Sequence, residues 1–332
     1  MELDEHLREL AERVGEELDK WFPPDTRPEI LARASRHLLE AGGKRLRPCL
    51  TLLSCEAVGG KVEDAIEAAA ALELLHTFTL IHDDIMDRDE FRRNVKTVHT
   101  IWGEPIAIIA GDALFAKVFE ALAANARRLG LTADRTLDLF ETVSRASFEI
   151  CQGQALDMLF EGKRDVGEAE YLAMVNGKTG ALMEASAKVG GLLGGGGPEQ
   201  IRALADYGRL VGIAFQIRDD ILGLTGNRDK FGKPIGSDIR EGKRTLVVVR
   251  ALEVAGPSDR EKLFLALGNE RATTAEIAAA IEVIKRTGAI EYAEKKAEEF
   301  VASAKSKLKI LPNSKAKELL LELADFAAKR EF

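Results

Sequence analysis

The sequence predicts an all-α protein built as one large helical bundle, and three observations support this. Ala, Leu, Glu, Lys and Arg dominate most segments, and these residues favour helices. Apolar residues recur at spacings of three and four, as at Ile66, Ala69, Ala70 and Leu74. Few segments alternate with the period of two that a half-buried strand requires. Helices are therefore expected along almost the whole chain.

Glycine and proline residues divide the chain into the expected elements. Helix ends are expected at Pro23–Pro24, Gly42–Gly43, Gly59–Gly60 and Gly130. A strongly apolar helix is expected from Asp64 toward Asp87, and another begins near Pro105. The glycine-rich stretch 190–198 is expected to be flexible. Residues 225–245, rich in Gly, Lys and Asp, are expected to form a loop near a functional site.

The 332 residues are expected to form a single domain over residues 1–332. No linker separates two compositions, and no repeat of the solenoid type is present. Hydrophobic residues make up 46% of the chain, which is enough for a sizeable core and excludes a disordered chain.

Charge and cysteine content exclude several classes of protein. The net charge of -8 argues against nucleic-acid binding. Three cysteines without a CxxC pair predict reduced thiols and a cytoplasmic protein. The acidic N-terminus lacks the features of a signal peptide. Charges interrupt every apolar run, so no stable membrane insertion is expected.

The segment HDDIMD places Asp83, Asp84 and Asp87 at the end of the apolar helix. Residues four apart lie on one helix face, so Asp83 and Asp87 are expected to point into one cavity. Buried carboxylates are costly unless a cation compensates them, and hard oxygen ligands suit magnesium. Taken alone, the motif fits a metal site and a solvated acidic helix end equally well.

The segment FQIRDDILG repeats this chemistry with Asp219 and Asp220 in a second apolar helix. Gln216 lies one turn before Asp220, so its amide is expected to face the same cavity. Two such acid pairs indicate facing helices that share a metal cluster. The predicted metal ligands are Asp83, Asp84, Asp87, Asp219 and Asp220.

Basic residues gather at expected loops and helix ends. They are Lys44, Arg45 and Arg47 in GGKRLRP, Arg92 and Arg93 in FRRN, Lys178 in MVNGKTG, and Lys233 and Lys243 in FGKPIGSDIREGKRT. Any one such cluster is more often a solvated face. Together with the paired acids, they indicate a ligand whose phosphates need both metal ions and basic side chains.

In this order the motifs resemble those of the all-helical trans-prenyl diphosphate synthases, most closely the archaeal geranylgeranyl type. They are GGKRLRP (42–48), DDIMD (83–87), RR (92–93), TVH (97–99), AGD (110–112), GQALD (153–157), KTG (178–180), FQIRDD (215–220), GKPIGSD (232–238) and GKRT (242–245). The ordered set spans over half the chain and is highly specific, although DDxxD alone is not. The resemblance implies the isoprenoid synthase fold, with a central active-site cavity.

The resemblance also implies a reaction. Isopentenyl diphosphate is condensed with dimethylallyl, geranyl or farnesyl diphosphate by metal-assisted ionisation, condensation and proton loss, with several magnesium ions per site. The resemblance implies that Asp83, Asp87 and Asp219 bind the metal ions, with support from Asp84 and Asp220. It implies that the allylic diphosphate is bound by Arg92, Lys178, Gln216 and Lys233, and isopentenyl diphosphate by Lys44, Arg47, His76 and Arg93. It further implies carbocation stabilisation by Thr179 and Gln216, and loop closure by Asp238 and Lys243.

Product length is expected to depend on Phe78 and Thr79. Phe78 lies five residues before Asp83, a little over one helical turn deeper. By the resemblance this position forms the tunnel floor, and one aromatic residue beside a small Thr79 is typical of geranylgeranyl diphosphate. Two aromatic residues would suggest farnesyl diphosphate. A purely core role for Phe78 stays open.

The chain departs from the family pattern at two places. Gly223 stands where the second motif commonly has a fifth-position Asp, so one carboxylate is missing. The segment RRNVKT replaces the usual RRGxPT, with Asn94 and Lys96 at the Gly and Pro positions, which leaves the loop shape open.

Several alternatives remain at this point. A farnesyl or longer diphosphate product within the same family is the nearest alternative. A terpene cyclase ionises a similar substrate but has no second one, and GGKRLRP together with the second acid pair argues against it. A non-catalytic partner subunit would be expected to lose the acids, and a helical interaction protein would not explain the ordered motifs. The resemblance implies a homodimer, for which the helices near residues 105–125 and 135–150 would supply the interface.

Overall fold

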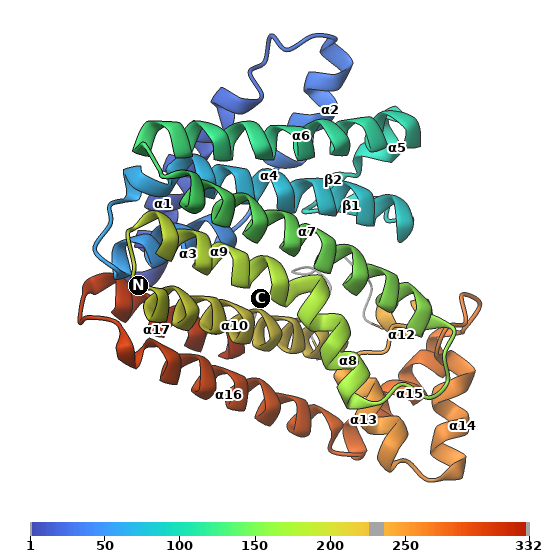
Figure 1. Cartoon of the computed structure of the whole chain (residues 1–332). Coiled ribbons are helices and arrows are strands. Elements are labelled where there is room, and N and C mark those ends of the chain that lie inside the picture. The colour runs from blue at the N-terminus through green and yellow to red at the C-terminus, as the bar shows by residue number, and fades with distance from the viewer. Residues whose placement is uncertain (1, 226–235, 330–332) are drawn as a thin grey trace. The chain divides into compact units, whose positions relative to one another are not determined.

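The computed structural model describes residues 2–225 and 236–329, and helices make up nearly all of it (Figure 1). The helices are α1 (Glu2–Trp21), α2 (Glu29–Glu40), α3 (Leu46–Ala57), α4 (Val62–Met86), α5 (Val98–Trp102), α6 (Glu104–Leu129), α7 (Ala133–Glu161), α8 (Glu168–Val175), η1 (Asn176–Gly180), α9 (Ala181–Leu193), α10 (Pro198–Thr225), α12 (Ser237–Glu241), α13 (Leu246–Val254), α14 (Pro257–Ala266), α15 (Thr274–Arg286), α16 (Ala289–Lys307), η2 (Leu308–Ile310) and α17 (Lys315–Lys329). The predicted all-α class is confirmed. In the described residues, no helix is long and apolar enough to cross a membrane.

The chain divides into two compact units. Unit 1 comprises Met1–Arg145, Leu182–Gly208 and Leu308–Glu322, and unit 2 comprises Ala146–Ala181, Arg209–Lys307 and Leu323–Phe332. Each unit is assembled from segments that are far apart in the sequence. The single domain over residues 1–332 stays a prediction.

The centre of unit 1 is α4, which packs against α1, α3 and α6 (Figure 1). Its run of alanines, Ala68–Ala71, is wholly buried, and such small side chains allow neighbouring helices to approach closely. The helix begins two residues before the predicted Asp64. The Asp64 carboxylate accepts a hydrogen bond from the Lys61 backbone N–H at 2.8 Å, which satisfies a free donor at the helix start.

The glycines of 190–198 serve packing, and the predicted flexibility of this stretch is wrong for its first part. Gly190 and Gly191 lie inside α9. A Cβ at Gly190 would lie 2.1 Å from the Thr51 carbonyl oxygen, and one at Gly194 would lie 2.4 Å from that of Cys55. Because only glycine permits such an approach, the run lets α9 and its C-terminal end pack against α3.

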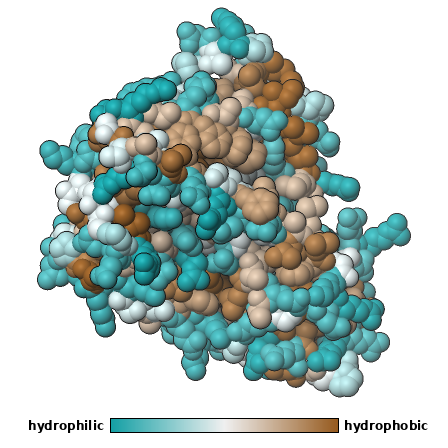
Figure 2. Space-filling view, in the orientation of Figure 1, coloured by the Kyte–Doolittle hydropathy of each residue, from teal (hydrophilic) through white to brown (hydrophobic). Residues whose placement is uncertain are grey.

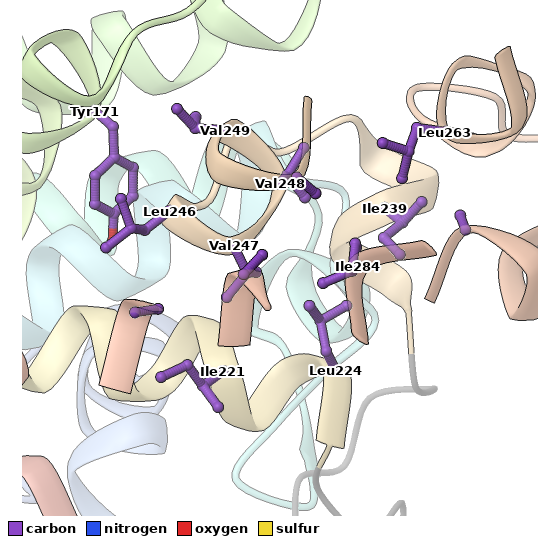
Figure 3. Packing of buried hydrophobic residues seen from close by; sticks show 14 of the residues in the cluster. Tyr171, Ile221, Leu224, Ile239, Leu246, Val247, Val248, Val249, Leu263 and Ile284 are labelled. Atoms are coloured by element: carbon purple, nitrogen blue, oxygen red, sulfur yellow. The ribbon is translucent and has the colours of Figure 1, made fainter. Parts of the chain in front are cut away.

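The core of unit 2 is formed by α8, α13, α15, α16 and the second half of α10. Figure 3 shows part of this packing, in which Leu246–Val249 of α13 lie among side chains from several helices. Tyr171 of α8 is wholly buried in the same cluster, as is Val247. This core supports the helices that carry the second acid motif.

Candidate active site

The first acid motif occupies the last turn of α4. Asp83 and Asp87 are half-buried, and the Asp87 backbone N–H donates to the Asp83 carbonyl oxygen at 2.8 Å. The two residues are therefore one turn apart on one face, as predicted. The C-terminal end of a helix carries partial negative charge, so carboxylates at this place are unfavourable without a cation.

Asp84 lies between them and is wholly buried. Its Oδ1 accepts a hydrogen bond from Arg92 Nε at 2.5 Å, whereas its Oδ2 is buried and has no hydrogen-bond partner among the described residues. Burial raises the pKa of Asp84 to about 6, against the opposing effect of Arg92. An orphaned carboxylate oxygen beside two further acids fits a site that takes a divalent cation.

Arg92 and Arg93 lie on a short hairpin, in the segment RRNVKT whose loop shape the sequence left open. Strand β1 (Phe91–Arg92) pairs with β2 (Val95–Lys96) in antiparallel register. The two residues between the strands, Arg93 and Asn94, have φ values of 51° and 63°. Left-handed φ at both central residues is typical of a type I′ turn, and asparagine tolerates it well. Asn94 therefore serves in place of the usual glycine.

Arg47, His76 and Arg93 form the second group in unit 1. Arg47 Nη1 donates to His76 Nε2 at 3.1 Å. Burial and the positive charge of Arg47 hold the pKa of His76 well below its usual value, so the ring is neutral and Nε2 accepts. Burial lowers the pKa of Arg47 to about 10, and its Nε has no partner among the described residues. These cations favour an anionic ligand.

Arg93 is held by backbone oxygens. Its Nη1 donates to the carbonyls of Leu38 and Gly42. Gly43 has a φ of 142°, which favours glycine, and a Cβ there would lie 2.8 Å from the Arg93 guanidinium carbon. Lys44, the next residue, is exposed. The GGKRLRP segment thus brings Arg47 and Arg93 toward the same part of unit 1.

Arg45 was grouped with the basic residues of GGKRLRP but was assigned no substrate, and in the structure it has a structural role. It is buried, donates to Glu73 Oε1 at 2.5 Å and also donates to the Leu39 carbonyl at 2.6 Å. The acidic Glu73 inside the apolar run of α4 was the available signal, because a buried acid needs a partner.

The second acid motif lies on α10 in unit 2. Asp219 is half-buried, and Asp220 is buried with both carboxylate oxygens hydrogen-bonded. Gln216 Nε2 donates to Oδ1 at 2.9 Å, and the Tyr171 hydroxyl donates to Oδ2 at 2.7 Å. Burial raises the pKa of Asp220 to about 7. Protein donors thus hold both carboxylate oxygens of Asp220.

Thr179 and Gln216, the predicted carbocation-stabilising pair, lie together. The Thr179 hydroxyl donates to Gln216 Oε1 at 2.8 Å, which fixes the orientation of the amide. Both Lys178 and Thr179 belong to η1, a single π-helical turn. Such turns often occur at functional sites, because they displace side chains from regular helical positions.

Asp157, absent from the predicted site residues, joins two of them. Its Oδ2 accepts from Lys178 Nζ at 2.7 Å and from Lys243 Nζ at 3.2 Å. Lys243 also donates to Glu161 Oε1 at 2.7 Å. Burial opposes ionisation of Asp157, yet the two lysines hold its pKa below the usual value. The spacing of Asp157 and Glu161, one turn apart on α7, was a signal for this cluster.

Another carboxylate lies beside Gly223, the position at which the second motif commonly has an Asp. A Cβ at Gly223 would lie 2.7 Å from Asp238 Oδ2, so the Asp238 carboxylate occupies the space beside this glycine. The negative charge of Asp238 also contributes to the raised pKa of Asp220. A carboxylate from α12 therefore lies where the second motif lacks its own.

Gln154 is a further residue that the motif analysis did not single out. Its side chain is buried, and neither the amide oxygen nor the nitrogen has a partner among the described residues. It lies one turn before Asp157 on α7, so a polar ligand or water beside the lysines would satisfy it.

The structure distributes the predicted residues over two units. Asp83, Asp84 and Asp87 belong to unit 1, whereas Asp219 and Asp220 belong to unit 2. Within residues 2–225 and 236–329, no three Asp, Glu, His or Cys residues form one ready group for a metal ion. The shared metal cluster stays a prediction, and Lys233 lies outside the described residues.

Comparison with known proteins identifies the family. The polyprenyl synthetase family model matches residues 28–284. A short chain isoprenyl diphosphate synthase of Methanothermobacter thermautotrophicus is 49% identical over 100% of this chain and 99% of its own. A geranylfarnesyl diphosphate synthase of Aeropyrum pernix is 44% identical over 91% of this chain and 95% of its own.

Solved structures agree with this assignment. The crystal structure of geranylgeranyl pyrophosphate synthetase from Pyrococcus horikoshii has a TM-score of 0.93 at 45% identity and covers 99% of both chains. That of a Corynebacterium glutamicum geranylgeranyl pyrophosphate synthase, complexed with isoprenyl diphosphate and magnesium, has a TM-score of 0.88 at 29% identity, covering 99% of this chain and 100% of its own. This chain is an enzyme of the polyprenyl synthetase family.

Proposed function

We propose that this enzyme condenses isopentenyl diphosphate with allylic diphosphates and that its main product is geranylgeranyl diphosphate. One observation carries the proposal: each compact unit holds acids and bases together at a predicted motif. Asp84 pairs with Arg92 in unit 1, and Asp157 pairs with Lys178 in unit 2. Paired acids and bases of this kind suit a diphosphate that arrives with its metal ions.

Magnesium is the proposed cation, and its proposed ligands are Asp83, Asp87 and Asp219. The orphaned Oδ2 of Asp84 supports a cation near the first motif. Asp84 and Asp220 would orient the ligands beside them, since each is buried and held by protein donors. When bound, magnesium would neutralise the charge that develops on the departing diphosphate.

Basic side chains would bind the two substrates separately. Arg92 and Lys178 would contact the allylic diphosphate, and each would exchange its carboxylate partner for a phosphate oxygen. Arg47, Arg93, His76 and Lys44 would bind isopentenyl diphosphate. A neutral His76 suits this site, because its ring accepts from Arg47 and leaves the other guanidinium donors for phosphate.

The chemistry requires ionisation without hydrolysis. The allylic C–O bond breaks to give a carbocation and diphosphate, and the alkene of isopentenyl diphosphate then forms the new C–C bond. Loss of one proton, with the released diphosphate as the proposed base, completes the step. The oxygen atoms of Thr179 and Gln216 would stabilise the cation as fixed dipoles. Asp238 and Lys243 would close the site against water.

An aromatic row supports the proposed chain length. The ring centroids of Phe78 and Phe115 are 5.0 Å apart. Those of Phe115 and Phe119 are 5.1 Å apart, and those of Phe119 and Phe140 are 6.2 Å apart. These contacts join α4, α6 and α7 within unit 1. Packed rings of this kind give Phe78 a firm support, as a tunnel floor requires. A farnesyl or longer product remains the nearest alternative.

A homodimer is also proposed. The exposed face of α7 carries Phe148, Met158 and Leu159, which are 65%, 48% and 69% exposed. On α6, Ile108 and Ile109 are exposed as well. Figure 2 shows hydrophobic side chains at the surface among hydrophilic ones. Apolar residues grouped on one helix face are typical of an interface.

The free cysteines, Cys49, Cys55 and Cys151, support a reducing, cytoplasmic location.

The decisive experiment incubates the purified protein with isopentenyl diphosphate and dimethylallyl, geranyl or farnesyl diphosphate, with and without magnesium. The alcohols obtained after dephosphorylation are then separated by chromatography. Geranylgeraniol that appears only with magnesium is the expected result. A chelated sample serves as the control and should give no coupled product.

Each other outcome selects an alternative. Farnesol or longer alcohols would retain the reaction and overturn the chain length. Cyclic hydrocarbons formed from one substrate alone would indicate a terpene cyclase. No product from folded protein would indicate a non-catalytic partner subunit, and would direct attention to Gly223 and the RRNVKT hairpin.

A further inference from the structure

Tyr171 is a buried tyrosine whose hydroxyl group donates to the second acid motif. It lies on α8 and has no exposed surface. Its hydroxyl donates to Asp220 Oδ2 at 2.7 Å. Figure 3 shows the hydroxyl end of Tyr171 beside Leu246. The phenol therefore connects α8 with the second acid motif on α10.

The bonds continue beyond Asp220. Gln216 donates to the other oxygen of Asp220, and Thr179 donates to Gln216. With Tyr171 these residues form one unbranched row of three hydrogen bonds, of 2.7, 2.9 and 2.8 Å. Every donor has one acceptor, so the orientation of each group depends on its neighbour.

We propose that Tyr171 is a positioning residue, which fixes the Asp220 carboxylate and, through Gln216, the Thr179 hydroxyl. The proposal rests on the proposed function. Without the phenol, Oδ2 of Asp220 loses the donor that it has among the described residues, and only Gln216 still restrains rotation of the carboxylate. A carboxylate that rotates no longer presents one geometry to Asp219 and its cation. The phenol ring also fills the core, so packing and positioning must be separated by experiment.

The test replaces Tyr171 with Phe, which keeps the ring and removes only the hydroxyl group. Tyr207→Phe is the matched control. Tyr207 is also wholly buried, and its hydroxyl donates to the Leu320 carbonyl in unit 1 at 2.5 Å. The measurements are the magnesium concentration for half-maximal coupling, kcat, and KM for isopentenyl diphosphate. Calorimetry of inorganic diphosphate binding with magnesium gives a readout that does not depend on turnover.

Tyr171→Phe should raise the half-saturating magnesium concentration by about tenfold, since a hydrogen bond to a charged group is lost. It should also lower kcat, weaken magnesium-dependent diphosphate binding, and leave KM for isopentenyl diphosphate unchanged. Tyr207→Phe should change none of these. In an Asp220→Asn background, Tyr171→Phe should have no further effect on diphosphate binding, because Tyr171 acts through that carboxylate.

Three results would overturn the proposal: a magnesium requirement within twofold of the parent, an equal effect of Tyr207→Phe, or an undiminished effect in Asp220→Asn. If the parent protein itself makes no coupled product, the proposed function fails. The calorimetric comparison would still decide the role of Tyr171.

Discussion

At the scale of single residues, the lysines in the site are held by acids. Asp157 binds both Lys178 and Lys243, and its side chain is only 7% exposed. Such an arrangement keeps two ammonium groups ordered before substrate arrives. A diphosphate would then bind to side chains that are already oriented, which reduces the entropy lost on binding.

Asp157→Asn should destabilise the protein by about 2 kcal/mol near neutral pH, because two charged hydrogen bonds are weakened. The folded pKa of Asp157 lies below its unfolded value, so its stabilisation is present above about pH 4 and disappears as the pH falls through the folded pKa. Urea unfolding at several pH values measures this.

Glu141→Gln is the control on the same helix. Its ion pair with Arg145 is 67% exposed on both sides, so little change is expected. An equal loss from both variants, or a loss from Asp157→Asn that does not diminish as the pH is lowered from neutral into the acid range, would contradict the assigned role of the buried carboxylate.

Phe78→Ala should lengthen the product by at least one isoprene unit, because the floor would move toward Phe115. Phe78→Ala with Phe115→Ala should lengthen it further, since the second ring supports the first. Chromatography of the dephosphorylated products measures the effect. Phe140→Ala, at the far end of the aromatic row, is the control and should leave the length unchanged. An active Phe78→Ala enzyme with the parent's product would show that Phe78 is a core residue only.

At the scale of elements, glycines set how closely the site helices approach. Where α7 crosses η1, a Cβ at Gly153 would lie 2.1 Å from the Lys178 backbone nitrogen, and one at Gly177 would lie 2.8 Å from the Glu149 carbonyl oxygen. This close crossing brings Asp157, one turn beyond Gly153, within 2.7 Å of Lys178. The hydrogen bond between Asp157 and Lys178 therefore depends on glycine at both position 153 and position 177.

Gly153→Ala should therefore destabilise the protein by about 2 kcal/mol or more and lower kcat, because backbone atoms must separate to admit the methyl group. Thermal unfolding and the coupling assay measure the two effects. Gly162→Ala is the control near the end of the same helix, where a Cβ would meet nothing within 4 Å. If both variants behave like the parent, the close approach does not limit stability or Lys178.

At the scale of the whole molecule, the exposed apolar face of α7 is the feature that the monomer leaves unexplained. Phe148 and Leu159 are among the most exposed large hydrophobic side chains in the described chain. Large apolar side chains are depleted from the surfaces of monomers when they lie side by side on one face. A second copy of the chain is the proposed cover.

Phe148→Glu should convert the proposed dimer into monomers, because an unpaired charge would be buried in the proposed interface. Sedimentation velocity measures the change in mass. Leu265→Glu on α14 is the control, since Leu265 is 52% exposed on a helix that is not part of the proposed interface. A parent protein that sediments as a monomer would reject the homodimer directly.

The sequence by itself determined the helical class, most helix ends, the two acid motifs and the family, because periodicity and ordered motifs are local signals. It also placed Asp83 and Asp87 one turn apart, since their spacing alone sets that geometry. Gly130 shows the same principle, because its left-handed φ of 58° ends α6 as the helix-end rules predict.

Only the tertiary structure decided which partners these residues have. Tyr171 and Asp220 are 49 positions apart, and Lys243 and Asp157 are 86 apart. The glycines of 190–198 resemble a flexible linker in sequence, yet Gly190 packs against a carbonyl oxygen of α3. A hydrogen bond or a close approach between distant segments depends on the packing of several helices at once, and no local pattern of residues encodes it.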